Sequence, residues 1–332
     1  MMRLIVTTDS STAGAVRLAG LANVVIVVEC RLVFGPLPSA AEFNAFFAPR
    51  NTRSSVRHWL DEIPPWYLGR WEDVGRRGLI ELLSESDSAE FWIGPRPNAQ
   101  LLLLSLLDLC SHESAAISKL MIRHLDTAVR GAEPERLAEL IPPAVKPTQD
   151  HLELARRAWR AYRAPTPRAW NDLLSTDLSL FPQLERGVID LLDELPNVTS
   201  GLGATETRIL ELIAPGKVRP FHVFPGDQKP NERRVYDYWE VGAVLDGLAR
   251  SPVPAIAGLK TGPFTLDLHE DARLFARYKR SLMSLTDFGA AVLAGEEDFW
   301  RRNPIRRWWG GTELTNERLW RWDRESRSLV AP

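Results

Sequence analysis

The stretch Leu4-Ile5-Val6-Thr7-Thr8-Asp9-Ser10-Ser11, near the start of the chain, decides the fold class. Its first five residues are apolar or β-branched, which is typical of a strand buried in a sheet. Residues 13–21 then show a helical pattern, and residues 23–28 form a second β-branched run. The order strand, helix, strand over so short a length predicts a βαβ unit with parallel strands.

The same alternation continues further along the chain. Weaker strand patterns lie at residues 90–93 and 119–125, and a helical pattern at residues 98–109 separates them. Parallel strands are usually covered by helices on both faces, so we predict an α/β domain with a mostly parallel, Rossmann-like sheet over residues 1–145. The segments between the second and third strands that are predicted to be helical are residues 40–47, 56–62 and 68–84.

A cluster of prolines at positions 142, 143 and 147 ends this domain. Residues 146–200 form a predicted helical linker, in which residues 151–163 have apolar side chains at helical spacing. In residues 201–332, helices and two short strands around a loop follow one another in the order of a winged helix-turn-helix. We therefore predict a winged-helix-like α+β domain that ends in a tail rich in tryptophan and arginine.

The composition limits the compartment and the partners. The chain has 332 residues, of which 45% are hydrophobic and 25% charged, and its formal net charge is -2. No overall field therefore favours nucleic acid or an anionic membrane surface. The most apolar run, residues 101–107, is far shorter than the roughly 18 residues that a membrane span requires, and the first residues reach a charge too early for a signal peptide. We expect a cytoplasmic protein with no membrane partner.

The sequence contains no motif for a metal or a nucleotide cofactor. Cys30 and Cys110 are far apart, and the six histidines are scattered without the spacing of metal ligands. Neither Gly-x-Gly-x-x-Gly nor Gly-Lys-Ser/Thr occurs, so neither dinucleotide binding nor a triphosphate-binding loop is indicated. We therefore predict no metal site, and the cofactor stays open.

The C-terminal half contains distinctive short motifs. They are Ser200-Gly201-Leu202 before Thr205-Glu206, Leu285-Thr286-Asp287-Phe288-Gly289, Trp308-Trp309-Gly310-Gly311 and Trp320-Arg321-Trp322-Asp323. Together with Asp9-Ser10 after the first strand and Gly35-Pro36 after the second, they make nearly the whole chain resemble a bacterial family known as domain of unknown function 1835. The resemblance implies a family but no established reaction.

One motif departs from the family pattern. After the third strand the family carries Glu-His-Asp and then Asp-Gln-Leu, whereas this chain has Ile93-Gly94-Pro95 and then Ala99-Gln100-Leu101. If the acidic and imidazole cluster binds a metal or moves a proton in the family, this chain has lost it and keeps only Gln100. The resemblance therefore implies a poorer candidate for an enzyme, and whether the chain catalyses a reaction stays open.

Polar residues follow the ends of the predicted parallel strands. Loops at the carboxyl ends of such strands converge on one crevice, where ligands bind. The polar residues that the strand predictions place there as a ligand-binding set are Asp9, Ser10, Ser11, Glu29, Arg31, Arg96, Asn98 and Gln100, with His124 and Asp126 after the fourth strand. Asp9, Ser10 and Ser11 also precede a helix, whose amides could face a small anion. A simple helix cap explains the same three residues equally well.

The tail offers a second, different surface. Arg306, Arg307, Trp308 and Arg321 combine charge with aromatic rings that could neutralise phosphates and stack bases. The same residues could instead lock the tail onto its own domain. The predicted helix over residues 235–249 carries Asp237, Glu240 and Asp246, which would repel phosphate in a groove.

Three functions remain open from the sequence. The first is a ligand-binding α/β domain coupled to a winged-helix-like module that binds a protein partner or regulates. The second is a hydrolase or transferase that acts on a phosphorylated or nucleotide-like small molecule. The third is a nucleic-acid binder through the tail.

Overall fold

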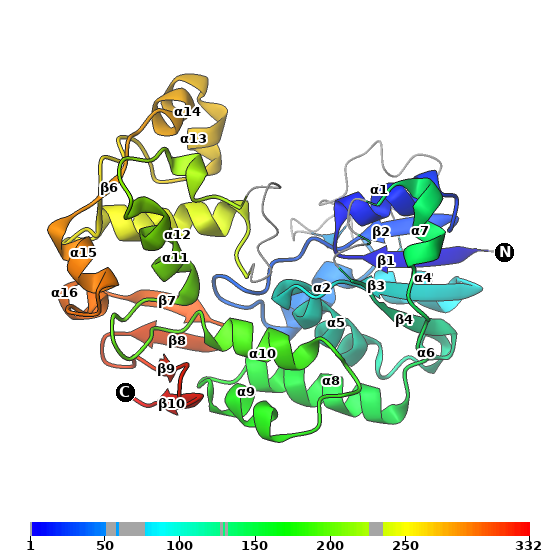
Figure 1. Cartoon of the computed structure of the whole chain (residues 1–332). Helices are drawn as coiled ribbons and strands as arrows, with labels where there is room; N and C mark the ends of the chain where they lie inside the picture. Colours follow the sequence, from blue (N-terminus) through cyan, green and yellow to red (C-terminus); the bar gives the residue numbers. More distant parts are fainter. Residues whose placement is uncertain (1, 51–57, 60–76, 127–128, 130–131, 226–234) are drawn as a thin grey trace. The chain divides into compact units, whose positions relative to one another are not determined.

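The computed structural model describes residues 2–50, 58–59, 77–126, 129, 132–225 and 235–332 (Figure 1). The chain divides into two compact units, which we call unit 1 and unit 2. Unit 1 comprises Met1–Leu32, Leu37–Arg163 and Leu173–Gly187, and unit 2 comprises Val33–Pro36, Ala164–Asp172 and Val188–Pro332. The predicted linker over residues 146–200 is therefore shared between the two units.

Unit 1 contains a sheet of four strands. They are β1 Arg3–Thr7, β2 Val24–Val27, β3 Ser88–Ile93 and β4 Leu120–His124. The strand order is β2-β1-β3-β4, and every neighbouring pair is parallel. The four predicted strands and the α/β class are confirmed.

Helices cover both faces of this sheet (Figure 1). They are α1 Ser10–Leu18, α2 Ala40–Phe47, α4 Leu79–Glu85, α5 Pro97–Cys110, α6 Ser114–Lys119, α7 Pro134–Leu140 and α8 Gln149–Tyr162. Helices α1 and α7 pack on one face, where Ile5, Val25 and Trp92 form a core with Val16 and Leu137. Helix α5 packs on β3 and is itself covered by α8, so twelve of its 14 residues are buried. None of the described helices is both long and apolar enough to cross a membrane.

Two predicted helices fall largely on residues that the structure does not describe. The predicted helix over residues 56–62 lies almost wholly outside the described residues, and of residues 68–84 only the last part is described, where α4 begins at Leu79. The other helices predicted in this part of the chain are found.

A charged residue lies inside the sheet of unit 1. The carboxylate of Glu90, in β3, pairs with Arg3 at 2.9 Å and with Arg123 at 2.6 Å, and it accepts a hydrogen bond of 2.7 Å from the indole of Trp92. Burial alone would raise the pKa of Glu90, but the bonds from Arg123, Trp92 and Arg3 outweigh it and lower that pKa. Glu90 interrupts the apolar pattern of β3, and its three partners make the interruption tolerable.

Up to the tail, the described part of unit 2 consists of helices and two very short strands. The elements are α9 Arg168–Asp172, α11 Ala204–Ile213, η5 Pro220–His222, α12 Tyr238–Arg250, β5 Ile256–Ala257, α13 Leu266–Glu270, α14 Ala272–Lys279, β6 Ser284–Leu285, α15 Asp287–Leu293 and α16 Phe299–Arg302. Strand β5 pairs with β6 in antiparallel fashion, and Val218 forms a bridge with Met283. Helix α10 Leu184–Leu192 and the short η4 Leu173–Ser175 lie where the division between the units crosses the chain. The predicted helices are found, but these elements alone do not confirm a winged helix.

The tail forms two hairpins that the sequence did not predict. Strands β7 Arg306–Trp309 and β8 Thr312–Thr315 pair in one, and β9 Arg321–Asp323 and β10 Ser328–Val330 pair in the other. Trp309 and Trp322 of these hairpins are buried, and Trp308 is half-buried.

Candidate functional site

The strand order of unit 1 creates a topological switch point between β1 and β3. The chain leaves β1 into α1, which packs on one face of the sheet, and leaves β3 into α5, which packs on the other. Ligands of open α/β sheets bind outside the carboxyl ends of the strands at such a point. The candidate site is therefore the corner between two loops, residues 8–9 before α1 and residues 94–96 before α5.

Asp9 is the N-cap of α1. Its Oδ1 accepts hydrogen bonds from the amide of Thr12 at 2.8 Å and from the hydroxyl of Thr12 at 3.0 Å. Ser10 and Ser11 follow in the first turn with exposed side chains, and that turn contains no acidic residue. The cap interpretation thus holds for Asp9, while the two serines lie at the positive end of the helix dipole.

Thr7 ends β1 and was not singled out in the sequence. It is only 1% exposed, and among the described residues its hydroxyl has no hydrogen-bond partner. A buried hydroxyl without a partner is costly. The position of Thr7, one residue before the turn into α1, is the only sequence signal that could have identified it.

His124 ends β4, at the same edge of the sheet. Neither ring nitrogen has a partner among the described residues. Burial, with a smaller contribution from His151, lowers the pKa of His124 to about 4. The ring lies 6.2 Å from Phe181, and it is neutral at pH 7.

Asn98 and Gln100, two predicted ligand-binding residues, are buried and contact the chain itself. Asn98 accepts from the amide of Leu32 at 2.8 Å and donates to the carbonyl of Cys30 at 3.0 Å. Gln100 donates to the carbonyl of Gly94 at 2.8 Å and to the side chain of Gln183 at 3.0 Å. In this arrangement the two amides fix the loops that follow β2 and β3, and a contact with a ligand stays a prediction.

The remaining predicted residues of the set come from the same edge. Glu29 is exposed and Arg31 is half-buried in the loop after β2, and Arg96 is half-buried just before α5. Two arginines from separate loops would add positive charge to the edge where α1 begins. Among the described residues, no group of three histidine, cysteine, aspartate or glutamate side chains could hold a metal ion.

The arginines predicted as a nucleic-acid surface in the tail contact carboxylates of unit 2. Arg307 pairs with Glu206 at 2.8 Å and lies over the ring of Trp300, 5.5 Å from its centroid. Arg306 is exposed and pairs with Glu313 at 3.2 Å. Trp308, in the same strand, is half-buried. These contacts are what a tail locked onto its own unit requires.

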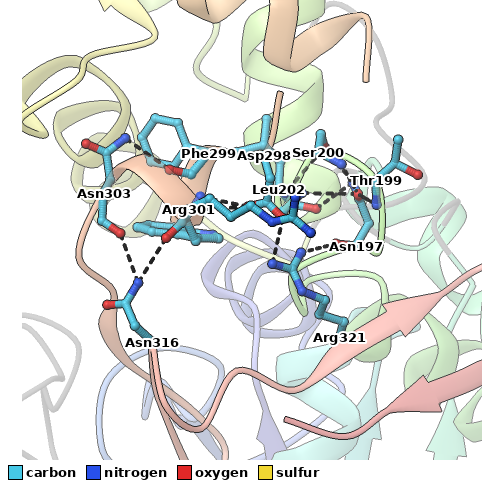
Figure 2. A network of polar contacts seen from close by, with 12 residues as sticks. Asn197, Thr199, Ser200, Leu202, Asp298, Phe299, Arg301, Asn303, Asn316 and Arg321 are labelled. Atoms are coloured by element: carbon cyan, nitrogen blue, oxygen red, sulfur yellow. Dashed lines mark hydrogen bonds and ion pairs between the residues drawn. The ribbon is translucent and has the colours of Figure 1, made fainter. Parts of the chain in front are cut away.

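Arg321 belongs to a polar network around the turn before α11 (Figure 2). It pairs with Asp298 at 2.6 Å and donates to the carbonyl of Asn197 at 2.7 Å. Asp298 also accepts from the amide of Trp300 at 2.9 Å, and the amide of Phe299 donates to the carbonyl of Ser200 at 2.8 Å. Ser200 and Arg321, quoted above for the family resemblance, therefore contribute to the packing of unit 2.

Comparison with protein-family models and with curated proteins finds no match to this chain. The resemblance to the family named above stays a prediction.

Proposed function

We propose that unit 1 binds a small anionic ligand, of the phosphorylated or nucleotide-like class, at the corner between the loops after β1 and β3. We further propose that unit 2 is a winged-helix-like module that binds a macromolecular partner and is regulated by this ligand. The observation that carries the ligand proposal is the start of α1 at the switch point, where the exposed Ser10 and Ser11 follow a strand that ends in Thr7, whose buried hydroxyl has no partner among the described residues.

The chemistry of this corner suits an anion. The first turn of α1 has the positive end of the helix dipole and no acidic side chain, and Ser10 and Ser11 add hydroxyl donors. Two bonds from Thr12 hold the Asp9 carboxylate in its capping position. Arg31 and Arg96, from the neighbouring loops, would supply the opposite charge that a phosphate prefers.

The order of elements in unit 2 supports the second part of the proposal. Helix α11 is followed by the bridge at Val218, the short helix η5, helix α12, and the paired strands β5 and β6. Two helices followed by a pair of antiparallel strands agree with the order of elements in a winged helix, with residues 214–237 between α11 and α12 in place of a tight turn.

The test of the ligand proposal is a thermal-shift series on the full chain. The probes are inorganic phosphate, a sugar phosphate, a nucleoside monophosphate and the uncharged parent of each phosphate ester. Ser11→Asp places a fixed negative charge in the first turn of α1, which helix electrostatics favours but an anionic ligand does not. The matched control is Ser114→Asp, which adds the same charge at the exposed first residue of α6.

We expect at least one phosphorylated probe to raise the melting temperature of the wild type and of Ser114→Asp but not of Ser11→Asp. A free probe concentration of about 100 times the dissociation constant would stabilise the folded protein by about 2.7 kcal/mol, which raises the melting temperature by several degrees. If no probe stabilises the wild type, or if Ser11→Asp responds like the wild type, this corner is not the site. Phosphorus NMR of the same mixtures would show turnover if the site were a hydrolase or transferase.

A further inference from the structure

The described arginines of unit 2 differ in their contacts. Eight pair with carboxylates, at distances between 2.6 and 3.9 Å. Arg168 lies over the ring of Trp320, and Arg208, Arg219 and Arg327, which are scattered along the chain, pair with no described carboxylate. The paired arginines of the described part of unit 2 are Arg250, Arg301, Arg302, Arg306, Arg307, Arg318, Arg321 and Arg324. Arg273, Arg277 and Arg280, on or directly after α14, are exposed, and none of the described carboxylates pairs with them.

These three arginines share one face of α14. Their spacing of four and three residues places them along one side of a helix. The opposite side carries Tyr278, which is fully buried and packs against Phe264 at a centroid distance of 5.2 Å. The arginines therefore point away from the core that holds the helix in place.

Helix stability explains only part of this charge. Arginines near the C-terminal end of a helix interact favourably with its dipole, which accounts for Arg277 and Arg280. Arg273 lies in the first turn, two residues after the cap at Asp271, where a positive charge is unfavourable. A further basic residue, Lys260, lies near the C-terminal end of α14, because its amide donates to the hydroxyl of Ser281 at 3.1 Å.

We propose that the outer face of α14, formed by Arg273, Arg277 and Arg280 with Lys260 beside it, binds the phosphate backbone of duplex DNA. Helix α14 lies between β5 and β6 in the chain, where a winged helix would carry its wing. The proposal rests on the partner-binding role proposed for unit 2 and names its partner. It moves the nucleic-acid surface from the tail, where the arginines are paired, to α14.

The dimensions and chemistry of this face fit a phosphate backbone. Seven residues of helix separate Arg273 from Arg280, which corresponds to about 10 Å along the axis. One strand of a duplex carries a phosphate every 3.4 Å or so of its axis, so the face spans about three phosphates. Guanidinium groups bind phosphate oxygens through two parallel hydrogen bonds.

The packing of α14 disfavours an anionic membrane as the partner. A helix that lies in a membrane interface inserts its apolar face among the lipids. In α14 the two aromatic residues are occupied, since Tyr278 and the half-buried Phe275 contact Phe264 and Phe221 within unit 2. Leu274, 41% exposed, is the one large apolar side chain of α14 left to face solvent, which is little apolar surface for insertion among lipids. An acidic protein remains the rival partner, and the experiment separates it from DNA.

The experiment measures binding of the full chain to a fluorescein-labelled 20-base-pair DNA duplex by anisotropy between 25 and 200 mM salt. The test variant is Arg273→Gln/Arg277→Gln/Arg280→Gln. The matched control is Arg302→Gln/Arg306→Gln/Arg318→Gln, which removes the same charge from exposed arginines that are paired with Glu297 or Glu313. The single variant Arg277→Gln provides the measurement if the triple variant folds poorly.

At low salt we expect the affinity of the test variant for the duplex to be at least about tenfold lower than that of the wild type. The affinity of the control should stay within about twofold of the wild type. The slope of log K against log salt should fall by about 2.7 in the test variant and by about 0.9 in Arg277→Gln, because each lost phosphate contact removes about 0.9. The proposal is overturned if the wild type does not bind duplex at 25 mM salt, or if the control weakens binding as much as the test variant. It is also overturned if unlabelled polyglutamate or anionic vesicles displace the duplex at equal charge concentration.

This outcome is separate from that of the ligand proposal. Ser11→Asp should retain duplex binding in the absence of ligand, and the α14 variant should retain the thermal shift with a phosphorylated probe. A wild type that shows the thermal shift but does not bind duplex at 25 mM salt would overturn only the inference about α14. A wild type that binds duplex but shows no thermal shift with any phosphorylated probe would overturn only the ligand site.

Discussion

Glu194 shows how strongly one buried side chain can depend on its neighbours. It is 3% exposed, and its carboxylate accepts from the hydroxyl of Thr205 at 2.6 Å. Burial raises the pKa of Glu194 to about 7; the bonds from Thr205 oppose this rise, and the nearby Glu206 adds to it. The side chain therefore changes charge near neutral pH, inside the part of unit 2 that Arg307 also contacts.

The raised pKa predicts that unit 2 loses stability as the pH rises. The folded state holds a proton on Glu194 up to about pH 7, whereas an unfolded carboxyl loses it near 4.5, so the free energy of unfolding falls between these values. Between pH 5 and pH 8 we expect the wild type to lose about 2 kcal/mol more than Glu194→Gln, whose amide can still accept from Thr205. Urea unfolding at both pH values measures the difference. Glu270→Gln, at an exposed carboxylate, should behave like the wild type, and an equal pH dependence in Glu194→Gln would contradict the assignment.

Residue identity and spacing predict where polar groups occur, but not with whom they bond. Asp9 was expected either to cap a helix or to bind a ligand, and its bonds to Thr12 arise within one turn. The partner of Gln100 is Gln183, which is 83 residues away, and no local pattern could have shown that contact. The same holds for Thr7, whose unusual feature is that no residue in the described part of the chain bonds to its hydroxyl.

At the scale of elements, the turn of residues 197–203 leads into α11 and also contacts the tail. Gly201 has a φ of +76°, and a β-carbon at this position would overlap the carboxylate of Asp298. Asn197 accepts from the amides of Thr199 and Ser200 at 2.9 and 2.7 Å and so holds the turn in shape (Figure 2). The glycine is needed both for the backbone angle and for the approach of Asp298, which pairs with Arg321.

We predict that Gly201→Ala destabilises the protein by about 2 kcal/mol, because it adds left-handed strain of about 1 kcal/mol and displaces the Asp298 carboxylate. The measurement is chemical denaturation followed by tryptophan fluorescence. The control is Gly247→Ala in α12, where a β-carbon meets nothing within 4 Å and helix propensity favours alanine. Gly247→Ala should be neutral or stabilising. Equal stability of the two variants would show that the turn has another conformation.

Elements with a long periodic pattern could be predicted from the sequence, and short ones could not. The β-branched runs gave β1 and β2, and the helical spacing of apolar residues gave α5 and α8. The tail strand β7 has the sequence Arg306-Arg307-Trp308-Trp309, which has no alternation of polar and apolar residues. Its strand conformation comes from pairing with β8 and from the buried position of Trp309, both of which depend on tertiary contacts.

At the scale of the whole molecule, each of the two units is built from three separate segments of the chain. The predicted boundary at residue 145 separates α8 from α5, whereas the observed unit 1 contains both helices and also Leu173–Gly187. The prolines near position 145 indicate a break in secondary structure, and a break of that kind need not coincide with the edge of a core. Helix α8 covers α5, and the hydroxyl of Tyr162 donates to the carbonyl of Leu32 at 3.2 Å.

The interleaved division predicts which fragments of the chain fold. A fragment of residues 1–145 would leave the apolar outer side of α5 in water, and it would also lack Gln183, which donates to the carbonyl of Leu125 at 2.7 Å. A fragment of residues 1–187 keeps α8, Gln183 and the contact of Phe181 with His151 at a centroid distance of 5.6 Å. We expect the longer fragment to unfold cooperatively in circular dichroism, and the shorter one to aggregate or to bind a hydrophobic dye without a cooperative transition. If both fragments unfold with the same cooperativity, α8 is not part of the core of unit 1, because burial of α5 would then not require it.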